Sequence, residues 1–319
     1  MKIAAQILRS TLFLLLICQT QLTFAQDWLD EEEGWGPRRR GIEFGLNMGV
    51  YQANNGLYTS SANFYNGDGY FELGDNTATL YSIEERMYLG TTDETIQNML
   101  NVSSFEIPYD AYSLNMMYNP SMLFGLKMVG FFNPEAAIVL AADVASLKAK
   151  GAYTINAGTI QPGQNTNTRV YGVFGEERRM MTMLGFRTSF YITDRSSWVF
   201  EFGEIMTATR IERNYFNVEQ ATFDLITQFN GPGNFNGPTS NLTNFGFGQY
   251  ATIGLEALFE EGGNLEANFR LSRDRIKLGS QEEDFNGDVK GYNMIQWNFA
   301  LYVTWMIPPH IGDFVRASF

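Results

Sequence analysis

Hydrophobic and polar residues alternate along several stretches of the chain. One face of the first stretch, 41–51, is apolar and carries Ile42, Phe44, Leu46, Met48 and Val50. A period of two places successive side chains on opposite faces of a β-strand. The same pattern predicts seven further strands, at 121–132, 136–150, 178–193, 197–215, 249–259, 265–277 and 292–307. The sequence therefore predicts an all-β protein of eight two-faced strands.

The connections between these strands alternate in length. Three are short turns, at 133–135, 194–196 and 260–264. Four are long, at about 52–120, 151–177, 216–248 and 278–291. Tight turns at one end and long loops at the other are typical of an antiparallel up-and-down transmembrane β-barrel, because its strands cross the bilayer in alternate directions. A secreted β-sandwich is the alternative, but its layout does not sort loops by length.

Charged residues occur inside the most apolar strands, on the face opposite the apolar one. Lys127 and Asp143 are the clearest cases, and the turn at 133–135 sets Lys127 opposite Ala141, within reach of Asp143. We therefore expect these two to pair. The predicted lumen charge network is Glu43, Lys127, Asp143, Arg187, Glu201, Glu256, Glu266 and Arg270. Side chains fill the interior of an eight-stranded barrel, and buried charges must pair, so the expected interior is a closed polar core.

Two features of the apolar face need a structural explanation. Trp198 and Trp305 lie near the short-turn ends of their strands, as in an interfacial aromatic girdle, with core packing as the alternative. Glu204 interrupts the apolar face that Trp198, Phe200 and Phe202 begin. A bulge near Gly203, or an early exit of this strand from the bilayer, would account for it.

The two ends of the chain differ in character from the strands. Residues 1–25 combine basic residues, an apolar run and a small-residue cleavage site, which predicts a secretory signal peptide. Residues 26–40 form an acidic tail with Trp28 and Trp35, read either as a periplasmic partner-binding peptide or as a solvated tail. The barrel is expected over 41–307, and 308–319 is a C-terminal tail.

Charge and cysteine content exclude several classes of function. Cleavage after residue 25 removes two basic residues and the single cysteine, Cys18, leaving 20 basic against 35 acidic residues. A chain that acidic repels nucleic acid, and a chain without thiols forms no disulfide or thiolate metal site. No stretch after residue 25 has the roughly 18 continuous apolar residues of a membrane helix.

The signal sequence, eight alternating strands, long loops and aromatic closing strand resemble the small outer-membrane β-barrel proteins of Gram-negative bacteria, of the OmpX, OmpW and OmpA-barrel kind. The resemblance covers about residues 41–307. It implies a location in the outer membrane, in contact with its lipid. Such barrels usually finish on the last strand with a terminal aromatic residue, whereas here Pro308 and Pro309 end the strand and a tail continues to Phe319, so either Trp305 or Phe319 could supply that aromatic signal.

Candidate chemistry is sparse. The single histidine, His310, follows the last strand, far from the long loops, which disfavours Ser/His and Asp/His catalysis. Asp284, Asn286 and Asp288 have the spacing of calcium ligands, but Val289 replaces the required glycine, so an acidic loop is the preferred interpretation. We predict no catalytic residues, no cofactor and no metal site.

The long loops are the remaining candidates for function. The first is too long for a connector, and its segment 92–100 predicts a short amphipathic helix that folds over the barrel mouth or meets a partner. The third mixes Asn, Gly and Phe. We therefore expect a non-catalytic barrel that acts through its loops and tail, as an accessory subunit of an envelope complex or in adhesion and envelope integrity, with protein partners in the outer membrane or periplasm. A narrow transporter of small solutes is the alternative, and an enzyme is disfavoured.

Overall fold

A computed structural model describes most of the chain after residue 40. The described ranges are 41–53, 61–68, 81–113, 116–158, 167–229, 235–238, 243–259, 263–279 and 292–307. The expected signal peptide (1–25), tail (26–40) and C-terminal tail (308–319) lie outside them, as do His310 and the acidic segment 282–288. No helix in the described ranges has the length and apolar character needed to cross a bilayer.

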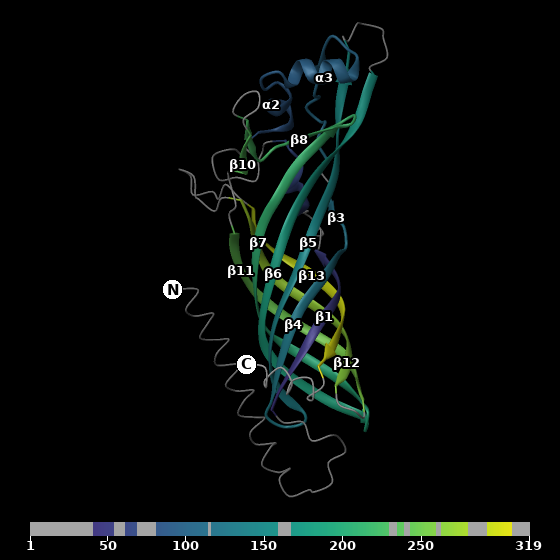
Figure 1. The fold of residues 1–319 in the computed structure, drawn as a ribbon, viewed down its shortest axis with the longest axis vertical. Coiled ribbons are helices and arrows are strands. Elements are labelled where there is room, and N and C mark those ends of the chain that lie inside the picture. Colours follow the sequence, from purple (N-terminus) through teal and green to yellow (C-terminus); the bar gives the residue numbers. More distant parts are fainter. Residues whose placement is uncertain are drawn as a thin grey trace, which may run out of the picture. The chain divides into compact units, whose positions relative to one another are not determined.

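Eight long antiparallel strands close into a ring (Figure 1). In order around the ring they are β1 (Gly41–Ala53), β4 (Ser121–Phe131), β5 (Ala136–Ala157), β6 (Asn167–Thr193), β7 (Ser196–Val218), β11 (Thr243–Leu258), β12 (Asn264–Leu278) and β13 (Tyr292–Met306). Pairing of β7 with β11 and of β13 with β1 completes the closure. The predicted eight-stranded antiparallel barrel is confirmed.

The strand register is strongly staggered. A row of directly paired residues leaves β1 at Ile42 and continues around the ring through Gly130, Ile138, Phe186, Phe202, Ala251, Leu271 and Phe299. It returns to β1 at Gln52, ten residues beyond Ile42. Such a stagger requires strands that tilt by roughly 40° from the barrel axis, and it decides which residues meet across the interior.

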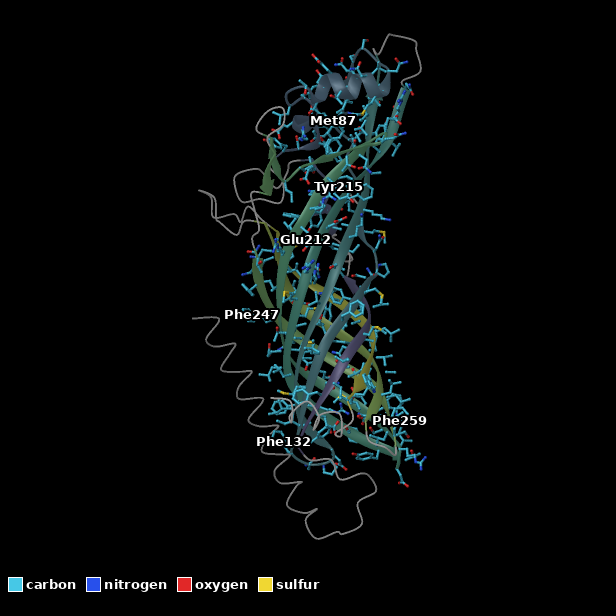
Figure 2. All side chains as sticks on the ribbon, in the orientation of Figure 1. Met87, Phe132, Glu212, Tyr215, Phe247 and Phe259 are labelled. Carbon is cyan, nitrogen blue, oxygen red and sulfur yellow. The ribbon has the colours of Figure 1, made fainter. Side chains whose placement is uncertain are left out.

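The outer surface of the barrel is an apolar belt. We use this name for the exposed side chains that alternate outward along the eight strands, such as Met48, Leu126, Leu184, Phe269 and Leu301. Figure 2 shows the side chains projecting from the strands, with Phe132 and Phe259 near the short turns, here called the turn end. Trp198 and Trp305 are both exposed on the belt, so the core-packing alternative for them is wrong.

Glu204 also faces outward. The pairing of β7 with β6 and β11 runs through Gly203 and Glu204 without a register shift, so the expected bulge near Gly203 is absent. Met206 continues the same face beyond Glu204 and is partly exposed. The carboxylate thus lies on the outward face of a regular strand, and an early exit of this strand from the bilayer stays a prediction.

Three strands are longer than the sequence indicated. β5, β6 and β7 have 22, 27 and 23 residues, and most of the expected second loop, 151–177, is β-strand. The third loop is also shorter than 216–248, because β7 ends at Val218 and β11 begins at Thr243. The prediction was wrong because outward residues such as Lys148 and Glu176 are polar, so the apolar face ends where the strands continue.

The first long loop folds into short elements against these extended strands. They are η1 (Ser61–Tyr65), α2 (Ile83–Met87), α3 (Thr92–Leu100), β2 (Phe105–Glu106) and β3 (Met117–Tyr118). β2 and β3 pair with β5. The helix predicted at 92–100 is confirmed as α3, whereas α2, which begins with a Ser82–Glu85 capping box, was not predicted.

The third long loop contributes three short strands. β8 (Ala221–Asp224) extends the sheet beside β7, and β9 (Thr227–Phe229) pairs with β10 (Phe235–Pro238). We call the extensions of β5, β6 and β7 beyond the belt, together with η1, α2, α3, β2, β3 and β8, the end cap; Figure 1 shows α2, α3 and β8 at that end of the long strands.

The end cap has a hydrophobic interior that is continuous with the buried apolar side chains of the barrel. Its buried side chains include Phe64, Ile83, Met87, Ile96, Leu100, Phe105, Tyr153, Ile155, Val173, Phe216, Val218 and Leu225. Arg86 joins α2 to β8 by donating to the Asp224 carbonyl at 3.3 Å and by lying 5.7 Å from the Phe223 ring centre. Burial lowers the pKa of Arg86. The end cap is therefore a packed structure.

Two glycines of β4 give a matched test of the barrel interior. A Cβ at Gly125 would collide with the Asp143 carboxylate and the Ala142 carbonyl, whereas a Cβ at Gly130 would meet nothing within 4 Å. We expect Gly125→Ala to lower the free energy of unfolding by about 1–3 kcal/mol, since overpacking forces neighbours to move. Gly130→Ala should change it little. Urea unfolding of the folded barrel, followed by tryptophan fluorescence, measures both, and equal effects would contradict the register.

Helix α3 allows the end cap to be disrupted separately from the barrel. Ile96 is fully buried, whereas Met99 on the same helix is 38% exposed. Ile96→Asp places an unpaired carboxylate in the cap core and should make residues 61–113 sensitive to protease. Met99→Asp should not. The barrel should keep its heat-dependent gel mobility in both variants, and loss of the barrel with Ile96→Asp would show that the two parts fold as one unit.

Candidate functional site

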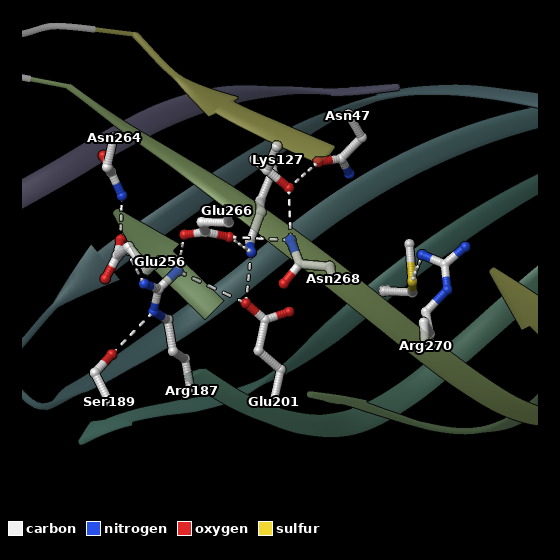
Figure 3. Close-up of polar contacts among 12 residues, drawn as sticks. Asn47, Lys127, Arg187, Ser189, Glu201, Glu256, Asn264, Glu266, Asn268 and Arg270 are labelled. Atoms are coloured by element: carbon white, nitrogen blue, oxygen red, sulfur yellow. Dashed lines mark hydrogen bonds and ion pairs between the residues drawn. The ribbon is translucent and has the colours of Figure 1, made fainter. Parts of the chain in front are cut away.

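The barrel interior contains charged side chains from six of its strands. Near the turn end, Arg187 of β6 lies between Glu256 of β11, at 2.9 Å, and Glu266 of β12, to which it also donates. Lys127 of β4 contacts Glu266 at 2.7 Å and Glu201 of β7 at 2.5 Å. Figure 3 shows that these side chains converge from different walls. The group links β4, β6, β7, β11 and β12 across the lumen.

Neutral polar groups complete this first layer. Ser197 donates to Glu256 at 2.8 Å, and Asn264 donates to the same carboxylate. The Phe131 ring lies 5.6 Å from the Arg187 guanidinium and closes the layer toward the turn end. Each carboxylate oxygen with a donor reduces the cost of burying the charge, because an unpaired buried ion costs several kcal/mol.

A second layer lies closer to the loop end of the barrel. Arg270 of β12 contacts Asp143 of β5 at 2.5 Å, and Asn47 of β1 donates to the same carboxylate at 2.9 Å. Thr304 of β13 donates to Asn47 at 2.8 Å, so the chain of contacts reaches the closing strand. Tyr302 stacks 5.3 Å from the Arg270 guanidinium. This layer joins both sides of the β13–β1 closure.

The third layer is centred on a carboxylate that the sequence analysis did not include. Asp274 of β12 accepts from Thr207 at 2.6 Å, Asn298 at 2.7 Å and Ser272 at 3.0 Å. Its donors are neutral. The inward face of β12 that includes Glu266 and Arg270 continues through Ser272 to Asp274. Asp274 could therefore have been found by following the alternation two inward positions further.

The last layer lies where the end cap begins. Arg179 pairs with Glu177 at 2.6 Å and donates to Tyr51 at 3.2 Å and Gln296 at 3.2 Å. Tyr65 and Tyr118, both from the first long loop, donate to Glu177 at 2.6 Å and 2.9 Å. Burial, and then the Glu177 charge, raise the pKa of Tyr65 well above its ordinary value, so its hydroxyl remains a donor. The loop thus forms part of this layer.

The structure places the predicted lumen residues as follows. Lys127, Asp143, Arg187, Glu201, Glu256, Glu266 and Arg270 are all buried in the interior, and Glu43 is half-buried on β1. The register pairs Lys127 with Ala141, as expected. The expected Lys127–Asp143 ion pair is wrong, because each takes partners from across the lumen. The cause is the stagger of the ring, which brings β12 and β7 side chains to both.

The sequence analysis missed several interior residues, and its expected tail site is outside the residues that the structure describes. Glu177 was overlooked because 151–177 was read as a loop. Arg179 lies within the predicted strand 178–193 and shares the inward face of Met181, Met183 and Arg187, so extending that face would have found it. Trp28 and Trp35 lie outside the described residues. Within the ranges that the structure describes, no three His, Cys, Asp or Glu side chains converge as metal ligands would.

Comparisons with known proteins return distant structural similarities. No family model matches the sequence, and no curated protein matches it either. The outer membrane protein OprG of Pseudomonas aeruginosa is 9% identical, with 86% of this chain and 100% of that chain covered and a TM-score of 0.37. Ail, the attachment invasion locus protein of Yersinia pestis, is 10% identical, with 84% and 100% covered and a TM-score of 0.29.

The outer membrane protease OmpT from Escherichia coli is also similar. It is 12% identical, with 62% of this chain and 67% of that chain covered and a TM-score of 0.30. At these values the likeness carries no functional conclusion. Such a conclusion must come from this chain's own side chains.

The Arg270–Asp143 pair tests whether the interior charges hold the barrel together. Arg270→Met leaves the Asp143 charge buried with only Asn47 as a donor, and should cost about 3–5 kcal/mol of unfolding free energy. Adding Asp143→Asn removes that charge and should recover most of the loss. The control is Arg178→Met, whose ion pair with Glu212 is exposed and should contribute less than about 1 kcal/mol. Urea titrations in detergent micelles compare the variants, and equal costs for Arg270→Met and Arg178→Met would contradict the proposed role of burial.

Proposed function

We propose that this protein is a non-catalytic integral outer-membrane barrel with a sealed lumen, and that it acts by presenting its end cap outside the cell and its N-terminal tail in the periplasm. The observation that carries this proposal is the interior itself. Buried charges and their donors fill it in four successive layers, from Arg187 near the turn end to Arg179 below the end cap. A diffusion pore needs a continuous open path for solute along the barrel axis. Here the side chains of these layers fill that path.

The apolar belt supports the membrane location. Bulky side chains are exposed on every strand of the ring, for example Val50, Phe124, Phe190, Ile253 and Leu301. Soluble monomers rarely expose continuous apolar patches larger than a few hundred Å², whereas a belt of this kind meets hydrocarbon in barrels of the outer membrane. Together with the predicted signal peptide at 1–25, this favours the outer membrane of a Gram-negative bacterium.

The end cap supports a role in binding. Short turns face the periplasm in barrels of this type and longer loops face outward, which places the end cap outside. Its core holds η1, α2 and α3 against three strands, so its surface has a defined shape. Exposed side chains on that surface include Tyr88, Met99, Tyr109, Met117 and Val170. A pre-ordered surface binds a partner without the entropy cost of ordering a loop.

An ordered end cap on a closed barrel favours a role as an accessory subunit of an envelope complex or in adhesion. This role requires a rigid external surface and a barrel that stays closed while anchoring it. The acidic tail with Trp28 and Trp35 is the proposed periplasmic contact. Catalysis is disfavoured because the interior carboxylates are engaged by cations and donors rather than aimed at an open cleft.

Conductance tests the sealed lumen. We expect barrels inserted in planar bilayers to show no stable ion current at neutral pH, because the first layer places Arg187 and Lys127 between three carboxylates in the path (Figure 3). Insertion is verified on the same preparation by protection of the barrel from protease. Reproducible single-channel steps would support the transporter alternative and overturn the sealed-lumen proposal.

Partner capture tests the binding role. A tagged chain cross-linked in intact cells should recover a defined set of proteins. Ile96→Asp should lose the external part of that set, whereas Ile96→Val, which keeps the buried position apolar, should retain it. Deletion of residues 26–36 should remove the periplasmic part. Recovery of the same proteins by all variants, or of none by the wild type, would count against action through the cap and tail.

A further inference from the structure

A row of polar side chains crosses the apolar belt on one side of the barrel: apolar residues continue beyond it on β7 and β11, whereas on β12 the outward face continues with Arg275 and Lys277. Glu204 of β7, Gln249 of β11 and Arg273 of β12 are direct register partners on three neighbouring strands, and all three are exposed. The Gln249 amide donates to the Glu204 carboxylate at 3.4 Å. On the next strand, Trp297 lies opposite Arg273, with its ring 5.8 Å from the guanidinium. We call Glu204, Gln249 and Arg273 the polar row.

The acidic end of the polar row has apolar neighbours on every side but one. Along β7 it lies between Phe202 and Met206, and across the sheet its partner on β6 is Leu184, which is 59% exposed. Gln249 lies between Phe247 and Ala251 on β11. If the belt meets hydrocarbon, as the proposed function requires, Glu204 is a carboxylate within the bilayer. Such residues are rare and costly, and they mark a site of interaction.

The barrel itself does not neutralise this carboxylate. Arg273, the cation of the same row, is two strands away, roughly 10 Å at about 4.8 Å per strand, and its guanidinium lies over Trp297. Among the described residues, Glu204 accepts a hydrogen bond from Gln249 and forms no ion pair. The row therefore presents an acid at one end, an amide in the middle and a base at the other end.

This order makes the polar row self-complementary. We propose that two copies of the chain associate within the membrane through this face, with a two-fold axis along the membrane normal passing near Gln249. Facing surfaces reverse the order of the row, so Glu204 of one copy meets Arg273 of the second copy, and the two Gln249 side chains meet each other. Both ends of the row gain a partner of opposite charge, twice per dimer.

The tilt of the strands is compatible with this pairing. A row perpendicular to strands tilted by roughly 40° climbs about 6 Å between Glu204 and Arg273. The two-fold axis keeps heights unchanged, so the pair must span that difference, which lies within the reach of an extended arginine. Phe202 and Phe247 flank the row and are 39% and 68% exposed, which provides apolar contact around the charges. In hydrocarbon, where water is excluded, such charge pairs are stronger than at an aqueous surface.

Charge exchange tests the proposed dimer. Glu204→Arg places like charges opposite each other at both ends of the row, and Arg273→Glu does the same with the opposite sign. We expect each single variant to lower the dimer fraction at least tenfold in vesicles at fixed protein-to-lipid ratio, and the double variant to return it to within about twofold of wild type. Native mass spectrometry and sedimentation in mild detergent measure the dimer. Unchanged dimer in the single variants, or failure of the double variant to recover, would overturn the proposal.

Cysteine cross-linking tests the position of the axis. The only cysteine, Cys18, lies in the expected signal peptide, so the chain from residue 26 onward is free of cysteine. Gln249→Cys should form a disulfide-linked dimer on oxidation. Leu140→Cys, on the same register row but at β5, is the matched control and should not. Equal cross-linking at both positions would indicate collision rather than a defined face.

Flotation of the same vesicles separates this inference from the proposed function on which it rests. Chains that remain soluble and do not float would refute the membrane location and the dimer together. Chains that float and keep heat-dependent mobility but stay monomeric would refute the dimer alone. Capture of a different membrane protein that depends on Glu204, without homodimer, would also overturn the dimer and assign the face to that partner.

Discussion

The burial of charge inside a narrow barrel is the constraint on which the structure depends. An eight-stranded ring has no room for bulk water, so each ion in it must find its counter-ion among the other walls. Lys127, Arg187 and Arg270 do so with carboxylates from β5, β7, β11 and β12. Most of these contacts join strands that are not neighbours in the sheet; Arg187 also lies 3.8 Å from Glu201 on the adjacent strand β7. The interior charges therefore brace opposite walls of the barrel.

Strands β5, β6 and β7 carry part of this interior, and their extensions also support the end cap. Along the inward face of β6, Arg187 and Arg179 belong to the polar lumen, whereas Val173 belongs to the apolar cap core. The change occurs at Glu177, which takes its donors both from the barrel and from the first loop, through Arg179 and Tyr65. A cap fastened in this way moves with the barrel wall, which suits a surface that must be held in one orientation.

The outer surface follows a different rule from the interior. Along most of the belt the requirement is only that side chains be apolar, so Phe, Leu, Ile, Met and Trp all occur. Glu204 departs from this rule within a regular strand, without a bulge to turn it away. Because the backbone does not turn the Glu204 carboxylate away from the belt, we infer that its partner is a group outside the chain, either lipid or protein. The order of acid, amide and base in the polar row favours protein.

The local pattern of the sequence determined the strands, their faces and their order. A period of two is a property of each strand alone, so the inward position of Asp143 or Glu266 follows from its neighbours, and the same local logic placed the helix at 92–100. The pattern misled where a strand and a loop look alike. Outward Lys148 and Glu176 are as polar in a strand above the belt as they would be in a loop, so the extensions of the tall strands, and with them Glu177, were missed.

Only the tertiary structure decided which charges meet. Lys127 and Asp143 are near neighbours in the β4–β5 register, yet Lys127 pairs with Glu201 and Glu266, and Asp143 pairs with Arg270. The choice depends on the ten-residue stagger accumulated around the whole ring, which sets the height at which distant walls face each other. No single strand carries that information, because it arises only when the last strand pairs with the first.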